Sequence, residues 1–166
     1  KKYLPRDEEG SVEKIFNLDQ IDLHTGNWLI LARTGSRLLE IMDLLKEKGI
    51  YYQTKKGKSF KVSLYKCILN YERAKTAPLT EAELSDVKEY TGKDVIDPDI
   101  PWFEAFEKAP QDEIQYIRLM LSNREKLSLD ARVRLSTIHA AKGGEEDNVI
   151  LILDNARKIR RAVQDS

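Results

Sequence analysis

Residues 27–53 read NWLILARTGSRLLEIMDLLKEKGIYYQ, and this stretch decides the fold class. Its first part, Asn27–Arg33, is a continuous apolar run that ends in polar residues, which is typical of a strand buried on both faces of a parallel sheet. Apolar residues then recur at helical spacing over 36–49, and Gly49 stands where a helix C-cap is expected. The segment 50–53 predicts a second short strand. Strand–helix–strand units are right-handed with parallel strands, so we expect an α/β fold with a mostly parallel sheet flanked by helices.

The next segment predicts helices more than strands. KKGKSF at 55–60 has the composition of a polar turn. An amphipathic helix is expected over 61–75, and the residues predicted on its buried face are Val62, Tyr65, Ile68 and Leu69. Thr80 and Glu83 form a capping box, which predicts a helix that ends near Gly92.

Two further helices are predicted after a loop rich in Pro and Asp. A short one carries Trp102, Phe103 and Phe106, for which core packing is favoured over a grip on a base or a partner. A longer one covers 111–126, and its expected buried stripe contains Ile114, Ile117 and Leu121. We therefore expect a helical insertion at about 76–126.

A second pair of strands is predicted in VRLSTIHAAKGGEEDNVILIL, residues 133–153. Val133, Leu135 and Ile138 mark one strand, and residues 149–153 mark the next. About ten residues connect them, which is near the minimum for a parallel crossover and long for a hairpin, so a crossover is favoured and a hairpin remains possible. In parallel sheets ligands bind beyond the carboxyl ends of the strands, which directs attention to this connection and to ARTGSR at 32–37.

The connection contains side chains that suit nucleotides or nucleic acids. Ser136 and Thr137 can donate hydrogen bonds to a phosphate, and His139 can bond a phosphate or stack on a base. Lys142 can neutralise a phosphate, and Glu145 can accept from a sugar hydroxyl. The alternative is a solvated turn with a capping Thr and a structural His, and HAAKGG is expected to form a turn or two of helix.

Composition limits the class of protein. The 166 residues suit one domain, and 28 Lys and Arg balance 28 Asp and Glu, so the zero net charge announces neither a nucleic-acid binder nor a membrane-surface protein. Cys67 is the one cysteine, which excludes an internal disulfide, and a buried thiol is expected. No apolar run approaches the ~20 residues of a membrane span, and the start has no signal-peptide pattern. We expect an intracellular, reducing compartment, and the first residue, which is not Met, suggests a fragment.

Residues 136–152, STIHAAKGGEEDNVILI, closely resemble motif V of the UvrD/Rep/PcrA group of superfamily 1 DNA helicases, commonly T-[LI]-H-x-[AS]-K-G-L-E-[FW]-x-x-V. The residues that match in register are Thr137, His139, Ala141, Lys142, Gly143, Glu145 and Val149. ARTGSR is similar to a motif near the start of the second RecA-like domain of the same family, with Arg33, Thr34 and Arg37 matching. The two motifs occur in the family's order and cover about a third of the chain.

The resemblance implies that the chain is the second RecA-like domain of an ATP-dependent DNA helicase, with the whole of 1–166 in that domain. In this family two such domains sandwich ATP and Mg²⁺, and single-stranded DNA crosses them, generally 3′ to 5′. Arg33, Thr34, Thr137 and His139 would contact DNA. Lys142, Gly143 and Glu145 would serve the ATP site, with Glu145 on the sugar. The implied partners are DNA and the first RecA-like domain of the same polypeptide, in the cytoplasm of a bacterium or a phage-infected host.

The chain also departs from the family pattern. Gly144 replaces the usual Leu, Glu146 the usual aromatic and Gly35 the usual Asn, which removes apolar packing and one DNA contact. The sequence has no G-x-x-x-x-G-K-[ST] phosphate loop, no acidic metal-binding motif and no V-x-x-T-R-A motif with its arginine finger. The expected spacing also leaves no room for a large accessory domain. We expect no ATP hydrolysis by this chain alone.

Two other functions compete with the motor domain. One is a helicase-like scaffold or nuclease-type protein that has lost its ATPase, and a degraded phosphate loop elsewhere in the polypeptide would indicate it. The other is a stand-alone single-strand binding module, against which stand the zero net charge and the scarcity of aromatics expected at the surface.

Overall fold

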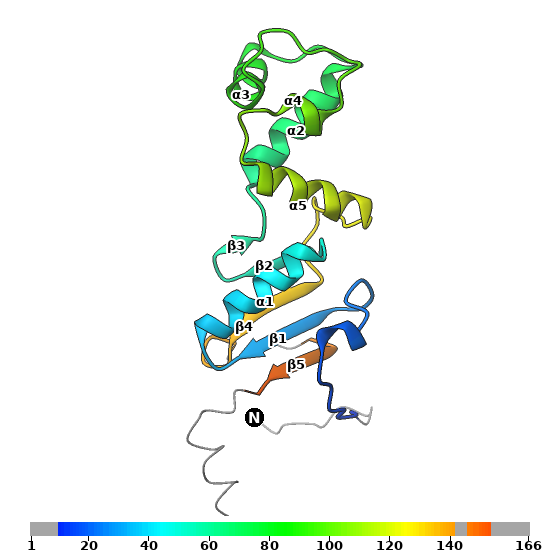
Figure 1. The fold of residues 1–166 in the computed structure, drawn as a ribbon, viewed down its shortest axis with the longest axis vertical. Coiled ribbons are helices and arrows are strands. Elements are labelled where there is room, and N and C mark those ends of the chain that lie inside the picture. Colours follow the sequence, from blue (N-terminus) through cyan, green and yellow to red (C-terminus); the bar gives the residue numbers. More distant parts are fainter. Residues whose placement is uncertain (1–9, 142–145, 154–166) are drawn as a thin grey trace, which may run out of the picture.

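The computed structural model describes residues 10–141 and 146–153, and Figure 1 shows their arrangement. The described residues contain one five-stranded sheet, with strand order β3-β2-β4-β1-β5. The strands are β1 (Trp28–Ala32), β2 (Tyr52–Thr54), β3 (Gly57–Lys58), β4 (Val133–Thr137) and β5 (Asn148–Ile152). Strands β2, β4, β1 and β5 are parallel, and the edge strand β3 is antiparallel to β2. The expected α/β class with a mostly parallel sheet is confirmed.

Strand β4 separates the two strands of the first predicted unit. β1 pairs with β4 and β5, whereas β2 pairs with β4 on its other side. Helix α1 (Gly35–Glu47) therefore crosses two strand spacings between β1 and β2, and it covers one face of the sheet. The core under α1 joins its Leu38 and Leu45 to Ile30 of β1, Leu135 of β4 and Ile150 of β5.

Strands β4 and β5 are parallel and lie on either side of β1, so the connection between them is a crossover. The step from β4 to β5 runs along the sheet in the direction opposite to the step from β1 to β2. A right-handed crossover in that direction is expected on the face opposite α1. Glu146, near the end of the connection, pairs with Arg134 at 2.9 Å. Arg134 alternates with the buried Val133 and Leu135 and so points away from α1. The favoured parallel crossover is confirmed.

The predicted polar turn at 55–60 contains a strand that composition did not indicate. Residues Gln53 and Thr54 pair with Lys58 and Gly57 in a tight β2–β3 hairpin. Gly57 has φ +122°, which a residue with a side chain rarely adopts. The hairpin forms the edge of the sheet that faces the helical part of the molecule.

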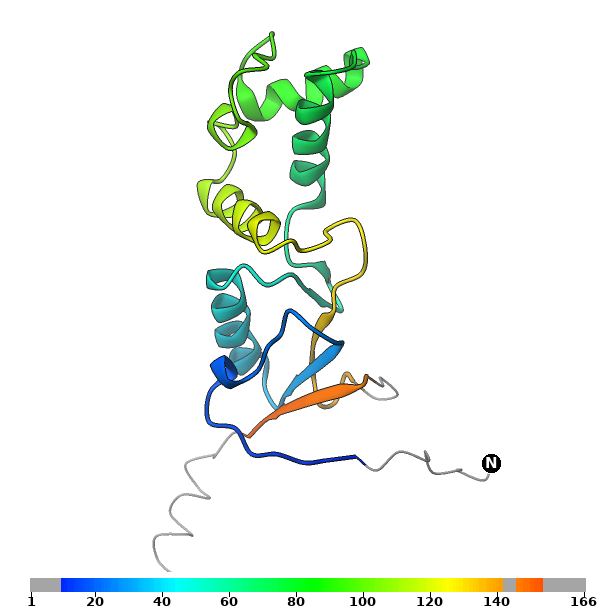
Figure 2. The same ribbon diagram turned by 90° about the vertical axis from the view of Figure 1, so that its right-hand side faces the viewer.

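Four helices between β3 and β4 form a second layer with a core of its own. They are α2 (Val62–Ala74), α3 (Glu81–Thr91), α4 (Trp102–Ala105) and α5 (Gln111–Ser122). Figure 2 shows this helical layer and the sheet layer stacked along the long axis. Its core contains residues of α2, so the helix expected over 61–75 packs together with the helices of the expected insertion at about 76–126. No helix in the described ranges is long and apolar enough to span a membrane.

Two predicted helix faces are wrong in part. In α2 the fully or nearly buried residues are Leu64, Cys67, Ile68 and Tyr71. Val62 and Leu69 are 43% and 50% exposed, because α3, α4 and α5 pack against the neighbouring stripe. In α5, Met120 is buried where Leu121 was expected. The predicted capping box of α3, the left-handed Gly92 after it and the buried Phe106 are confirmed.

The two layers meet where α5 packs on the end of α1 and the start of β2. Tyr116 of α5 donates a 2.8 Å hydrogen bond to the carbonyl of Ile50 and lies 2.7 Å from the hydroxyl of Ser59. Asn123 donates to the carbonyls of Lys48 and Gly49 at 2.8 and 3.2 Å. Gly49 has φ +64°, and a Cβ there would stand 2.4 Å from Leu119, so a side chain at 49 would separate the layers.

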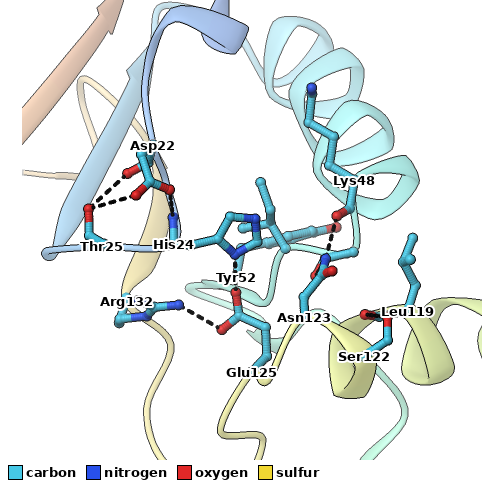
Figure 3. A network of polar contacts seen from close by, with 12 residues as sticks. Asp22, His24, Thr25, Lys48, Tyr52, Leu119, Ser122, Asn123, Glu125 and Arg132 are labelled. Carbon is cyan, nitrogen blue, oxygen red and sulfur yellow. Dashed lines mark hydrogen bonds and ion pairs between the residues drawn. The ribbon is translucent and has the colours of Figure 1, made fainter.

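A buried carboxylate extends this junction to the start of the sheet, as Figure 3 shows. Glu125, just after α5, lies 3.2 Å from the Arg132 guanidinium and 3.5 Å from Nδ1 of His24. Its side chain is 3% exposed, so these two groups compensate most of its lost hydration. Asp22 accepts from the amide of His24 and the hydroxyl of Thr25, which holds the pKa of Asp22 below its usual range.

The Tyr116 hydroxyl gives a direct test of the junction. We expect Tyr116→Phe to lower the free energy of unfolding by about 1–3 kcal/mol, because the buried Ile50 carbonyl loses its donor. Tyr65→Phe is the control, since Tyr65 packs on the same helical core and its hydroxyl bonds to no described residue. Urea unfolding followed by circular dichroism measures both, and equal losses in the two variants would contradict the role given to Tyr116.

Candidate nucleic-acid interface

The two predicted DNA-binding segments meet at the carboxyl ends of β1 and β4, which we call the carboxyl edge of the sheet. In the β1–β4 pairing Ala32 is opposite Thr137, so both strands end at the same level. The amide of Ile138 donates a 3.0 Å hydrogen bond to the carbonyl of Ala32, which ties the two strand ends together. Arg33 and His139 therefore follow adjacent strands at one edge, although about a hundred residues separate them in the sequence.

On the β1 side, the edge carries the N-terminus of α1. Thr34 is the N-cap residue, and its hydroxyl lies 3.1 Å from that of Ser36 instead of capping a helix amide. The first amides of α1 thus have no side-chain cap from Thr34, and a helix N-terminus carries a partial positive charge. Arg33 precedes them and is exposed. This arrangement suits a phosphate, and motif matching alone did not point to the amides.

On the β4 side, a single helical turn begins at Thr137. The Thr137 carbonyl accepts hydrogen bonds from the amides of Ala140 and Ala141, both at 3.0 Å. Oγ1 of Thr137 accepts a hydrogen bond from the Ala140 amide at 3.3 Å. Thr137 is therefore a cap, as the alternative interpretation held, but Oγ1 acts there only as an acceptor and its proton remains available to a ligand. The His139 side chain is exposed and makes no hydrogen bond or ion pair with a described residue.

The three predicted ATP-site residues, Lys142, Gly143 and Glu145, lie outside the described residues. Their roles stay predictions. The structure does describe Glu146, one of the departures from the family pattern. Its ion pair with Arg134 leaves the Glu146 side chain 15% exposed, so the residue anchors the crossover to β4 instead of merely losing an aromatic contact.

Basic and acidic side chains of the described residues lie at opposite ends of the parallel strands. The described residues that directly follow the parallel strands (33–37, 55–57, 138–141 and 153) include no carboxylate, and their basic side chains are Arg33, Arg37, Lys55, Lys56 and His139. Arg37 is paired with Glu40 one turn along α1. The segments that directly precede the strands carry most of the nearby acids, namely Asp22, Asp130, Glu146 and Asp147. Among the described residues, basic side chains thus follow the parallel strands, and acids together with Arg132 precede them.

The molecule also has a groove, and it lies away from the carboxyl ends of the strands. A groove of about 630 Å³ lies between α1 and α5, and its lining includes Lys46, Arg118 and Leu119. Within the described ranges no three His, Cys, Asp or Glu side chains lie close enough to hold a metal ion. The basic edge is an open surface, which suits an extended polymer better than an enclosed small molecule.

Comparison of the chain with protein-family models, curated proteins and solved structures finds no match. The family resemblance therefore rests on the motif residues and their order.

The cap at Thr137 can be tested by amide hydrogen exchange. We expect Thr137→Ala to speed exchange at Ala140 about fivefold, because loss of a side-chain cap costs about 1 kcal/mol. Thr137→Ser keeps the hydroxyl and should exchange as the parent chain does. The Ala141 amide, which bonds only to the backbone carbonyl of Thr137, is the internal reference. Unchanged exchange at Ala140 in the alanine variant would show that Oγ1 does not hold the turn.

Proposed function

We propose that this chain is the second RecA-like domain of a UvrD/Rep/PcrA-type DNA helicase, which moves along single-stranded DNA with ATP hydrolysis, generally 3′ to 5′. One observation carries the proposal. The β1–β4 register brings the residues of two separately matched motifs, Arg33 and Thr34 with Thr137 and His139, to adjoining strand ends.

The chemistry of the edge supports strand binding. Arg33 and the amides at the start of α1 provide for phosphates, and the exposed His139 provides for a phosphate or a base. The described part of the edge has no Trp, Tyr or Phe, so it lacks the stacking platform of a stand-alone single-strand binding module. Contacts mainly to the backbone suit a protein that must move along a strand of any sequence.

The order of elements supports a motor domain. The predicted ATP-site residues follow the Thr137 turn directly, so one short connection carries both proposed contacts. Bound ATP with Mg²⁺ would supply the energy of movement, and the remaining ligands would come from a first RecA-like domain of the same polypeptide. A small helical layer with its own core occupies the place of a larger accessory domain.

The second candidate is a helicase-like scaffold without ATPase activity. Gly144 and Glu146 favour it, since neither supplies the apolar packing of the family pattern, and Glu146 is engaged with Arg134. The two candidates differ in ATP hydrolysis by the complete polypeptide and share strand binding by this domain.

Strand binding is tested first on the chain itself. We expect Arg33→Ala and His139→Ala each to weaken binding of a labelled single-stranded DNA about fivefold at 0.1 M salt, measured by fluorescence anisotropy. For Arg33 the loss should vanish near 1 M salt, because it reflects released counterions. His24→Ala is the control for His139, since His24 lies at the opposite edge, and thermal melting confirms that it is folded. No binding by the parent chain at low salt would overturn the proposal.

Nucleotide coupling is tested in the complete reading frame that contains these residues. We expect His139→Ala to lower DNA-stimulated ATP hydrolysis while leaving nucleotide affinity intact. Glu145→Ala should mainly weaken nucleotide binding, seen as a raised KM for ATP. If the parent polypeptide binds DNA but hydrolyses no ATP, the scaffold function replaces the motor.

A further inference from the structure

The β2–β3 hairpin lies beside the strand ends of the proposed interface. β2 runs parallel to β4 with Gln53 opposite Arg134, so Thr54 lies level with Leu135. The chain reverses between Thr54 and Gly57, so the turn at Lys55 and Lys56 comes about one residue further, near the level of Ser136. Figure 1 shows the hairpin turn and the ends of β4 and β1 at the same side of the sheet. The sequence pattern of this turn gave no sign of which edge it would join.

The hairpin holds its lysines in two different ways. Lys58, at its base, donates to the carbonyls of Leu127 and Leu129 at 2.8 and 3.2 Å and lies over the rings of Tyr51 and Phe60. Lys55 and Lys56, at the tip, are exposed and pair with no carboxylate of the described chain.

The tip itself is held in place. The amide of Lys56 donates to the hydroxyl of Thr54 at 3.1 Å, and Gly57 takes the positive φ that closes the turn. The tip thus presents two cations on an ordered turn, which loses less entropy on binding than two lysines in a long loop would.

We propose that Lys55 and Lys56 bind the phosphates of the same nucleic-acid strand that crosses β4 and β1. This inference rests on the proposed function and extends its contact surface by one strand. Adjacent strands are about 4.8 Å apart, so the row from the hairpin tip through His139 to Arg33 spans about 10 Å of edge. No carboxylate among the described residues interrupts the row, so a strand can pass along it without meeting a like charge.

The test compares two double variants of the full chain that remove the same charge. Lys55→Ala with Lys56→Ala removes the tip lysines, and Lys66→Ala with Lys126→Ala removes two exposed lysines away from this edge. Each phosphate contact contributes about 0.7 to the log–log salt slope for a single strand, so the tip variant should lose about 1.4 of slope. At 0.1 M salt this corresponds to binding about 25-fold weaker, and the control should change little.

Oligonucleotide length gives a second readout that general electrostatics would not move. Affinity should stop rising at a shorter length in the tip variant than in the parent chain, because the strand loses its contact at one end of the row. Equal slopes and equal length dependence in the two double variants would overturn the role of the hairpin. If Arg33→Ala and His139→Ala still weaken binding in that case, the proposed function stands without the hairpin. If the parent chain binds no strand at low salt, both proposals fail together.

Discussion

The parallel pairing of β1 with β4 is the constraint on which the other features of the molecule depend. Its register aligns Trp28 with Val133 and Ala32 with Thr137, and it brings together segments about a hundred residues apart. Closing a long connection costs little more than closing a short one, because the entropy grows only with the logarithm of length. Lys58 offsets part of this entropy cost, since it donates hydrogen bonds to the carbonyls of Leu127 and Leu129. These bonds hold the segment that leaves the sheet layer after β3 beside the segment that returns to it before β4.

The helical layer is attached in a way that leaves the basic edge open. Its polar contacts with the sheet layer involve the end of α1, the start of β2, the hairpin base and the segment before β4. Glu125 adds a contact with His24 and Arg132 at the amino edge. The carboxyl ends of β1 and β4 point the other way. If the helical layer moved as a body on this junction, it would pull on the hairpin base and on the segments before the strands. The geometry of Arg33 and His139 at the strand ends would stay intact.

Local signals in the sequence predicted the helices and strands well, but they predicted poorly which elements pair or pack together. The apolar run of β1, the Gly49 and Gly92 helix ends and the Thr80 capping box depend on residues close in sequence, so composition and spacing could reveal them. The position of β4 between β1 and β2 depends on pairing across the whole chain. The buried stripe of α2 was misplaced because its apolar residues allow two adjacent stripes, and only the packing of α3 to α5 selects one. For the site, the motifs predicted Arg33 and His139, but neither the α1 amides nor the hairpin tip carries a sequence signal, because both join the edge only through the fold.

A neutral chain can still attract a phosphate backbone if its charges are far enough apart. Strands β1, β4 and β5 each have five residues, which at about 3.3 Å per residue separates the two ends of these strands by about 17 Å. The Debye length is about 8 Å at physiological ionic strength, so the acids at the amino edge are largely screened from a strand at the carboxyl edge. The proposed strand would lie beside Arg33, Lys55, Lys56 and His139, and its interaction with Asp22, Asp130 and Asp147 would be largely screened. Zero net charge is therefore compatible with the proposed interface, because the described acids before the strands and the described basic residues after them lie about two Debye lengths apart.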